Sequence, residues 1–354
     1  MSEPTTLVLL ARATESMQHL LHYVFAPAFL TNWRQVPHFW IICPQADAPL
    51  MAPLAERLGA TLRHDEEFPN IKLLPPYQRQ IAIKLLVAEH VTTPTYLTLD
   101  CDCLFLPPGP AALFNANGKP YLHPNFSQNY YHRYWLENCN PLTGNQRFVE
   151  PMMGFTPQLF ITRHVRALCD GVAQQAESDF ITAILRWEQI YRARVAPVQA
   201  NVAAIDHTVL KPALVSDALL RVHHAWTEYA LYWSYILAHG LEGDYATSQP
   251  LCDKFFMGKN WSAHIGHTIP TLSEAELEFD LLAEGFFNYR APLAVIQSTA
   301  GADWQRVTSV LARYGLIDVR HIMPRANEQP EVQQALAKIL AGERIDPLPT
   351  GELV

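Results

Sequence analysis

The hydrophobic pattern of the first hundred residues alternates between two kinds of segment. Short apolar runs, typical of strands buried on both faces, occur at residues 6–11, 39–43, 61–63 and 96–99. Patterns typical of helices separate them, at residues 15–25, 50–58 and 77–90. Strands joined by helices of this length predict right-handed crossovers. We therefore expect an α/β fold with a mostly parallel sheet and helices on both faces.

The second half of the chain has a less regular pattern. Residues 157–169, 178–190 and 225–239 favour helices, and the chain beyond about residue 300 is amphipathic and helical. We find no internal repeat, low-complexity linker or sharp shift in composition. The expected organisation is one domain over residues 1–300, followed by a helical C-terminal appendage over residues 301–354.

Composition and charge narrow the class of protein. Of the 354 residues, 49% are hydrophobic and 17% are charged, so the chain can bury a substantial core and is not disordered over most of its length. The net charge is −8 and no long run of Lys or Arg occurs. Nucleic acid is therefore not expected as a partner, because binding it needs a basic face.

The sequence predicts a cytoplasmic protein, either free or peripheral at the inner membrane surface. No secretion signal is expected, because the N-terminal region lacks a basic segment and its apolar run ends at Arg12. No transmembrane segment is expected either, because no uninterrupted apolar stretch reaches about 18 residues. The six cysteines are scattered without paired CxxC spacing, which favours reduced thiols.

The most informative segment is Leu99–Phe105, LDCDCLF, where an apolar strand runs into two aspartates. Burying unpaired carboxylates is costly, and a hard divalent cation such as Mn²⁺ or Mg²⁺ compensates them while also binding phosphate oxygens. The alternative is that Asp100 and Asp102 cap a turn or pair with basic residues. Their place at the carboxyl end of a parallel strand, where ligands gather, favours the metal site. Cys101 and Cys103 are expected to be buried small hydrophobic residues.

The stretch Tyr77–Pro108, in which a helix precedes this strand, resembles the core of GT-A glycosyltransferases. More closely, it resembles a largely uncharacterised bacterial family of glycosyltransferase-like proteins with the strand pattern YLxLDxDxxFL. The resemblance covers roughly residues 5–300. It implies a Rossmann-like GT-A fold with a nucleotide-binding half over about residues 1–110 and an acceptor half over about residues 111–300.

The resemblance also implies an activity. A metal-dependent glycosyltransferase would move a sugar from a nucleotide-diphosphate donor, a UDP-sugar by family analogy, to an acceptor hydroxyl. The acceptor class is a glycan, a lipid-linked sugar or a small molecule. Two alternatives use the same residues: a non-catalytic nucleotide-sugar-binding protein, and a metal-assisted phosphoester or nucleotide hydrolase.

The resemblance assigns roles in donor and metal binding. Asp102 would coordinate the metal directly, and Asp100 would bind the metal or reach the ribose. A histidine of the segment SAHIGH, His264 or in its place His267, would complete the metal site, although no lysine–proline–tryptophan motif follows it. Gly154, in the segment PMMGF, would let the backbone approach the sugar or the acceptor closely; an ordinary turn glycine is the alternative.

Two further residues have competing interpretations. Glu228, in the segment WTEY, matches the acidic motif that supplies a catalytic carboxylate and would act as the general base. The alternative is a glutamate at a helix start that interacts with the helix dipole. Arg79, near Gln80 and Lys84 on the helix before the strand, could reach the diphosphate, whereas solvation at the surface is the usual role of such a cation. If Glu228 is a base, the reaction inverts the configuration at the anomeric carbon. If Glu228 only positions the acceptor, retention of that configuration stays an alternative.

Overall fold

The computed structural model describes most of the chain, namely residues 5–107, 109–122, 124–125, 130–149, 152–153, 156–203, 225–247, 252–255, 292–296, 304–325 and 328–342. Its main sheet has five strands in the order β3–β2–β1–β4–β8. These are β1 (Thr5–Leu10), β2 (His38–Cys43), β3 (Thr61–His64), β4 (Thr95–Leu99) and β8 (Gln158–Ile161). The first four run parallel and β8 runs antiparallel to β4. The predicted α/β fold with a mostly parallel sheet is confirmed.

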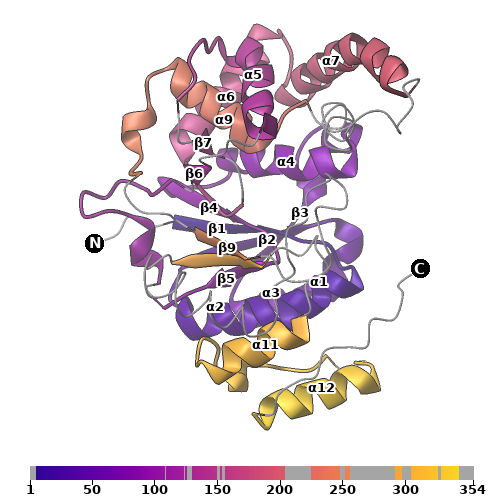
Figure 1. The fold of residues 1–354 in the computed structure, drawn as a ribbon, viewed down its shortest axis with the longest axis vertical. Coiled ribbons are helices and arrows are strands. Elements are labelled where there is room, and N and C mark those ends of the chain that lie inside the picture. The colour runs from indigo at the N-terminus through magenta and orange to yellow at the C-terminus, as the bar shows by residue number, and fades with distance from the viewer. Residues whose placement is uncertain are drawn as a thin grey trace.

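Helices cover both faces of this sheet (Figure 1). The face that is lower in the figure carries α1 (Glu15–Leu20), the π-helix η1 (Leu21–Phe25), α2 (Ala26–Asn32), α3 (Ala48–Leu58), α11 (Trp304–Arg313) and α12 (Pro330–Leu340). The upper face carries α4 (Pro76–Leu86), α5 (Tyr130–Thr143), α6 (Thr162–Gln175), α7 (Phe180–Ala203) and α9 (Glu228–Ala238).

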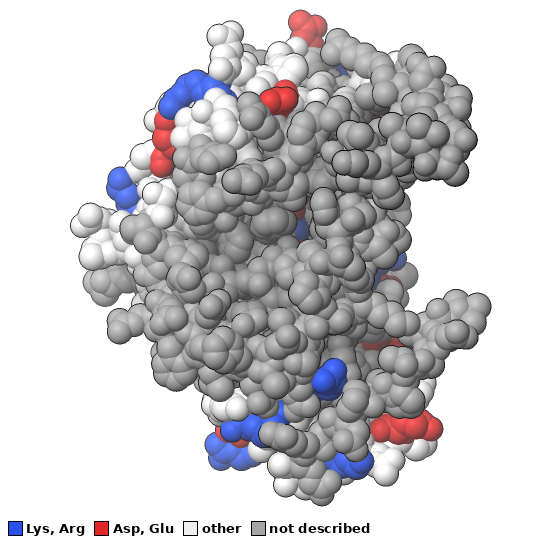
Figure 2. All heavy atoms as spheres, in the orientation of Figure 1, with Lys and Arg blue, Asp and Glu red and all other residues white. Residues whose placement is uncertain are grey.

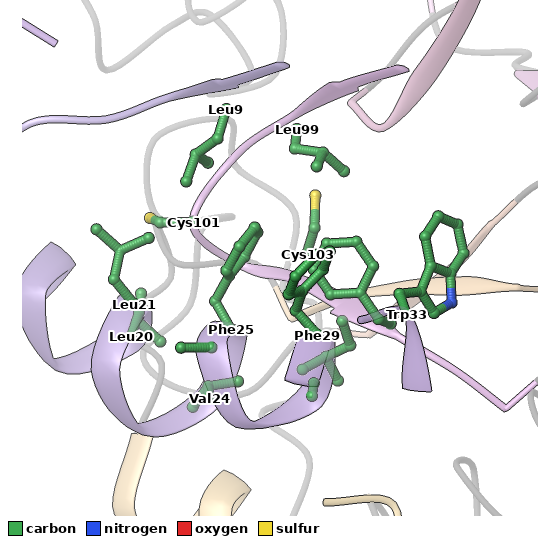
Figure 3. Close-up of a cluster of buried hydrophobic side chains, with 14 of the residues drawn as sticks. Leu9, Leu20, Leu21, Val24, Phe25, Phe29, Trp33, Leu99, Cys101 and Cys103 are labelled. Atoms are coloured by element: carbon green, nitrogen blue, oxygen red, sulfur yellow. The ribbon is translucent and has the colours of Figure 1, made fainter. Parts of the chain in front are cut away.

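The strands alternate between two hydrophobic cores. Leu7 and Leu9 of β1 belong to the lower core, whereas Val8 and Leu10 belong to the upper one. Successive side chains of a strand point to opposite faces, so a strand covered on both sides reads as a continuous apolar run. All six residues of β1 are accordingly buried. Figure 3 shows part of the lower core, where side chains of η1 and α2 lie under the ends of β1 and β4.

Smaller sheets extend the fold beyond the main sheet. One has three strands in the order β5–β10–β9, namely β5 (Cys103–Phe105), β10 (Leu293–Ile296) and β9 (Cys252–Phe255). The other pairs β6 (Pro124–Asn125) with β7 (Met152–Met153). Strand β5 follows β4 after three residues, so the end of β4 turns directly from the main sheet into the three-stranded one.

The observed elements agree with most of the pattern, with one correction. The helix expected at residues 50–58 ends at Gly59, whose φ of 65° is the left-handed conformation that glycine adopts without strain. The helix expected over residues 157–169 is wrong in its first part, because Gln158–Ile161 form β8 and the helix begins at Thr162. All four residues of β8 are buried, and a short apolar run of this kind has no period that separates a strand from a buried helix.

The described helices beyond residue 300 pack on the lower core. Val310 of α11 and Leu336 of α12 belong to the same cluster of buried side chains as Leu7 and Leu9. The division at residue 300 therefore stays a prediction about domains, while the contacts show that these two helices cover the main sheet.

An ion network centred on the buried Glu328 ties the segment before α12 to α1. The Arg325 guanidinium donates to Glu328 through Nε and Nη2, at 2.9 and 2.7 Å, and to Glu15 at 2.6 Å. The Glu328 side chain is fully buried and also contacts the Tyr23 hydroxyl and, at 3.2 Å, the His19 ring. The contact between Arg325 and Glu15 joins positions 310 residues apart in the sequence.

None of the described helices has the length and apolar character needed to cross a membrane. In the face shown in Figure 2, described acidic and basic side chains both occur toward the top and toward the bottom of the view.

Replacing Glu328 with Gln should lower the free energy of unfolding at pH 7 by about 2–3 kcal/mol. Burial alone would raise the pKa of Glu328, but hydrogen bonds from Arg325, Tyr23 and His19 outweigh it and hold the pKa at about 2 instead of 4.5. Because the folded pKa lies below the unfolded one, this stabilisation is present above about pH 4.5 and is lost as the pH falls toward 2.

Urea denaturation at pH 7 and pH 3 measures the effect. The gap between wild type and Glu328→Gln should be wide at pH 7 and narrower at pH 3, whereas the exposed Glu331→Gln serves as a control with little change. Equal stability of wild type and Glu328→Gln at pH 7 would contradict the prediction.

Candidate active site at the carboxyl edge of the sheet

The two aspartates of the predicted metal motif lie where β4 leaves the main sheet. Strand β4 ends at Leu99, and residues 100–102 form a turn closed by a hydrogen bond of 3.1 Å from the Cys103 N–H to the Asp100 carbonyl. The Asp100 side chain is 33% exposed, whereas Asp102 is buried. The turn therefore presents one accessible and one buried carboxylate at the carboxyl edge of the parallel strands, the edge at which α/β proteins bind ligands.

The cysteines of the motif are buried, as predicted. Cys101 and Cys103 belong to the lower hydrophobic core. Figure 3 shows their sulfur atoms among apolar side chains of η1 and α2. Burial raises the pKa of the Cys101 thiol well above its usual value, so it stays protonated and unreactive.

A buried lysine joins this turn to two other segments. The Lys84 Nζ lies 3.2 Å from Asp100 Oδ1 and 3.0 Å from Glu228 Oε1. It also donates to the Thr156 hydroxyl at 2.8 Å and to the Tyr229 hydroxyl at 3.1 Å. The ammonium group thus has oxygen atoms of four residues around it, from the turn after β4, the segment before β8 and the start of α9.

Helix α4 fixes the place of this lysine. Helices α4 and α9 pack together on the upper face of the sheet (Figure 1). The Lys84 carbonyl accepts a hydrogen bond of 2.8 Å from the Tyr96 hydroxyl, which anchors α4 over β4. Gln80 lies one helical turn before Lys84, and its amide donates to Asp100 Oδ1 at 3.3 Å.

Glu228 is the first residue of α9, so the helix-start interpretation is correct as far as position is concerned. Thr227 caps the helix, and its hydroxyl accepts the Ala230 N–H at 3.1 Å. Yet the Glu228 side chain is only 2% exposed and faces Lys84 instead of solvent. A helix-start glutamate that served only the dipole would not need a buried partner.

Lys84 and Glu228 each stabilise the charged form of the other. Burial opposes the charge on Lys84, but Asp100, Tyr229 and Glu228 outweigh it and hold the Lys84 pKa well above its usual value. Burial raises the pKa of Glu228, against the opposing effect of Lys84. Lys84 is therefore a permanent cation, while Glu228 has its pKa moved in the direction that general-base chemistry at neutral pH requires.

The other predicted site residues are not brought to this cluster within the described part of the chain. Arg79 instead contacts Asp65 just after β3, with Nη1 3.7 Å from Asp65 Oδ2. Its contact with a diphosphate stays a prediction. Gly154, His264 and His267 lie outside the described residues.

The donor chemistry of Asp100 and Asp102 fits a hard divalent cation, because both are carboxylates and one is accessible. A second candidate set does not fit. Glu15, His19 and Glu328 place ligand atoms within 4.8 Å of one another. However, Arg325 Nη2 lies 2.6 Å from Glu15, 2.7 Å from Glu328 and 3.1 Å from His19, so a guanidinium already occupies the position of a cation.

Sequence reasoning missed the role of Lys84 and the hydroxyls of Thr156 and Tyr229. A signal for Lys84 was present, since it follows Ile81 by three positions and precedes Ala88 by four. These spacings place it on the buried face of α4, where a cation needs partners. No comparable signal marks Thr156, because its contact depends on how β8 lies beside β4.

Two cavities in the described part of the chain lie elsewhere. Their volumes are about 620 and 630 Å³. The first is lined by Thr95 at the start of β4, and the second by Thr5 at the start of β1. Both therefore lie near the amino ends of the parallel strands, away from the Asp100 turn.

Comparisons with known proteins give the following likenesses. The model of a family of unknown function, DUF6492, matches residues 20–319. No curated protein matches the chain. Among solved structures, mouse xyloside xylosyltransferase 1 in its apo form has a TM-score of 0.43 and 10% identity over 84% of this chain and 98% of that chain.

A galactosyltransferase LgtC structure with donor and acceptor sugar analogues has a TM-score of 0.39 and 12% identity over 94% of this chain and 100% of that chain. An active-site mutant of LgtC has a TM-score of 0.41 and 11% identity over the same shares. Likeness at this level does not identify a reaction.

Replacing Lys84 with Met should lower the free energy of unfolding by about 3 kcal/mol or more, because it leaves the Glu228 carboxylate buried without a cation. The double variant Lys84→Met with Glu228→Gln should recover part of this loss, since it buries no charge at Glu228. Urea denaturation compares the variants.

Lys72→Met is the matched control, because Lys72 is 68% exposed and pairs only loosely with Glu66, at 3.7 Å. It should change stability by less than about 0.5 kcal/mol. The interpretation fails if Lys84→Met is no more destabilising than Lys72→Met.

Proposed function

This chain belongs to the DUF6492 family of proteins of unknown function, and we propose that it is a glycosyltransferase of the GT-A class. It transfers a sugar from a nucleotide-diphosphate donor, a UDP-sugar in the first instance, to the hydroxyl of a glycan, a lipid-linked sugar or a small molecule. The proposal rests on the geometry of the chain and on the sequence motif at the end of β4.

One observation carries the proposal. Asp100 and Asp102, in the turn of residues 100–102 (the DxD turn), lie at the carboxyl edge of a parallel sheet. The buried Lys84 connects Asp100 to the carboxylate of Glu228, which is 128 positions away in the sequence. A metal-binding turn next to a second, buried carboxylate supplies the two functions that glycosyl transfer needs, namely donor binding and proton removal.

Asp102 and Asp100 would hold the Mn²⁺ or Mg²⁺ ion. When bound, such an ion neutralises negative charge on the leaving diphosphate. Asp100 is exposed enough to meet the donor, and Asp102 lies buried beneath it in the same turn. Gly154, Arg79 and a histidine, His264 or His267, are further proposed members of the donor site.

Glu228 is the proposed general base. Its carboxylate accepts the proton of the acceptor hydroxyl as that oxygen attacks the sugar, and Lys84 holds the side chain in place at 3.0 Å. Attack assisted in this way comes from the side opposite the diphosphate, so the reaction inverts the anomeric centre. A role limited to positioning the acceptor would leave retention open.

A thermal-shift screen of nucleotide sugars with and without Mn²⁺ tests the donor class. Stabilisation by nucleotide-diphosphate sugars but not by nucleoside triphosphates supports the proposal. Binding without transfer or slow donor hydrolysis would instead favour a non-catalytic nucleotide-sugar-binding protein. Turnover of simple phosphoesters or nucleotides would favour a metal-assisted hydrolase.

Asp102→Asn should abolish Mn²⁺-dependent donor binding while the protein stays folded. The substitution removes the charge that balances the cation, and an amide oxygen is a weaker ligand for a hard ion. Isothermal titration of UDP in the presence of Mn²⁺ measures the loss.

Asp170→Asn serves as the control, because Asp170 is exposed on α6 and belongs to no part of the proposed site. Folding of both variants is checked by circular dichroism. Unchanged Mn²⁺-dependent binding by a folded Asp102→Asn protein would remove the basis of the metal assignment.

Glu228→Gln should reduce kcat by about 10²–10⁴-fold with little change in donor affinity, because glutamine cannot accept the proton at neutral pH. Since the pKa of Glu228 lies above its usual value, the wild-type rate should fall as the pH drops through that raised pKa. The variant should lose this acidic limb of the profile.

Glu331→Gln is the matched control for the helix-start interpretation. Glu331 also lies in the first turn of a helix, α12, but is exposed. A joint collapse of donor affinity and transfer would place Glu228 in the binding shell. If neither changes, the base must be sought elsewhere, with Asp253 and Asp206 the next acids to test.

A further inference from the structure

Lys84 Nζ has more oxygen neighbours than hydrogens: it donates hydrogen bonds to Thr156 and Tyr229 and forms ion pairs with Asp100 and Glu228. An ammonium group donates three hydrogen bonds. The structure places four acceptor oxygens within 3.2 Å of Lys84 Nζ, one each from Asp100, Glu228, Thr156 and Tyr229. At any moment, one of the four oxygens therefore receives no hydrogen from Lys84. Any one of the four can move away, and each Lys84 hydrogen still has an oxygen to bind.

The acceptor that can leave at least cost is Asp100. Glu228 and Tyr229 are buried, with only 2% and 5% of their surfaces exposed, so losing Lys84 would cost each of them more than it costs an exposed group. The Asp100 side chain is 33% exposed and has a second donor in the Gln80 amide. Its contact with Lys84 is also the longest of the four, at 3.2 Å.

We propose that Lys84 is a positioning residue that holds Asp100 before the donor binds and gives it up to the donor, while keeping its contacts with Glu228, Thr156 and Tyr229. This inference rests on the proposed function, because it takes a nucleoside diphosphate with a divalent cation as the group that Asp100 meets. The surplus makes the exchange easy, because the oxygens of Glu228, Thr156 and Tyr229 remain for the three hydrogens of Lys84 after Asp100 leaves. Glu228 therefore stays fixed while its neighbour changes partner.

The hydroxyl of Thr156 makes this surplus testable. Thr156→Val removes one acceptor, together with the hydrogen bond between the Thr156 and Tyr229 hydroxyls, and leaves three acceptor oxygens for three hydrogens. The contact between Lys84 and Asp100 then becomes a full hydrogen bond, and releasing Asp100 strands a hydrogen of Lys84. Thr156→Ser keeps the hydroxyl and should behave like wild type, which a role of Thr156 in packing alone would not produce.

The first measurement is the affinity for UDP with Mn²⁺, by isothermal titration. Thr156→Val should raise the Kd about tenfold, whereas Thr156→Ser should stay within about twofold of wild type. Tyr229→Phe, which removes another acceptor, should raise the Kd in the same direction. The control Thr92→Val, at an exposed residue outside the site, should have no effect.

The second measurement needs no donor, so that failure of this inference and failure of the proposed function can be told apart. In a double-mutant cycle by urea denaturation, Asp100→Ala, which removes the acceptor oxygen altogether, should cost more stability in Thr156→Val than in wild type. Additive effects of the two substitutions would overturn the acceptor surplus. If the two substitutions are coupled but wild type shows no Mn²⁺-dependent UDP binding, the donor is not the group that replaces Lys84 at Asp100, and the proposed function fails with it. Coupling together with UDP binding that Thr156→Val leaves unchanged would overturn the exchange alone.

Discussion

The candidate site depends on the positive charge of the Lys84 ammonium group, which holds Asp100 and Glu228 together. A carboxylate buried as deeply as Glu228 is unfavourable without a cation beside it. Lys84 supplies that cation and is itself buried, so each charge is stable only in the presence of the other. Because the two lie on α4 and α9, this mutual need fixes the distance between the helices at the edge of the sheet.

The fold brings these charges to the edge through ordinary packing. Tyr96, on the face of β4 that meets the upper core, anchors the Lys84 carbonyl, and Phe160 of β8 stacks on both Tyr96 and Tyr229 at 5.3 and 6.1 Å between ring centres. Aromatic contacts thus join β4, β8 and α9, and the Tyr96 hydrogen bond adds α4, so this packing acts together with the ion pair in positioning the helices. The ion cluster lies where this apolar layer ends and the turn after β4 begins.

Much of this arrangement could be predicted from the sequence. Strands buried on both faces give continuous apolar runs, which is why β1, β2 and β4 and the DxD turn were found at their observed places. The pattern predicts the start of a helix where the structure has β8, because the pairing of β8 with β4 is a tertiary contact that leaves no local period. Asp100, Asp102 and Glu228 were identified as candidates, but the contact between Asp100 and Glu228 through Lys84 could not be, since it joins residues more than 100 positions apart.

A comparison of the Arg325 and Lys84 ion clusters shows why the first suits a static role and the second a binding site. Arg325 presents a planar fork whose Nε and Nη2 both bind Glu328, at 2.9 and 2.7 Å. Such a bidentate pair fixes the orientation of both side chains, and separating them breaks two hydrogen bonds at once. Lys84 is a point charge with three hydrogens among four oxygens, so its contacts can be exchanged singly. An arginine at position 84 would keep the charge but not this freedom, because its donors diverge in a plane and could not converge on the same four oxygens.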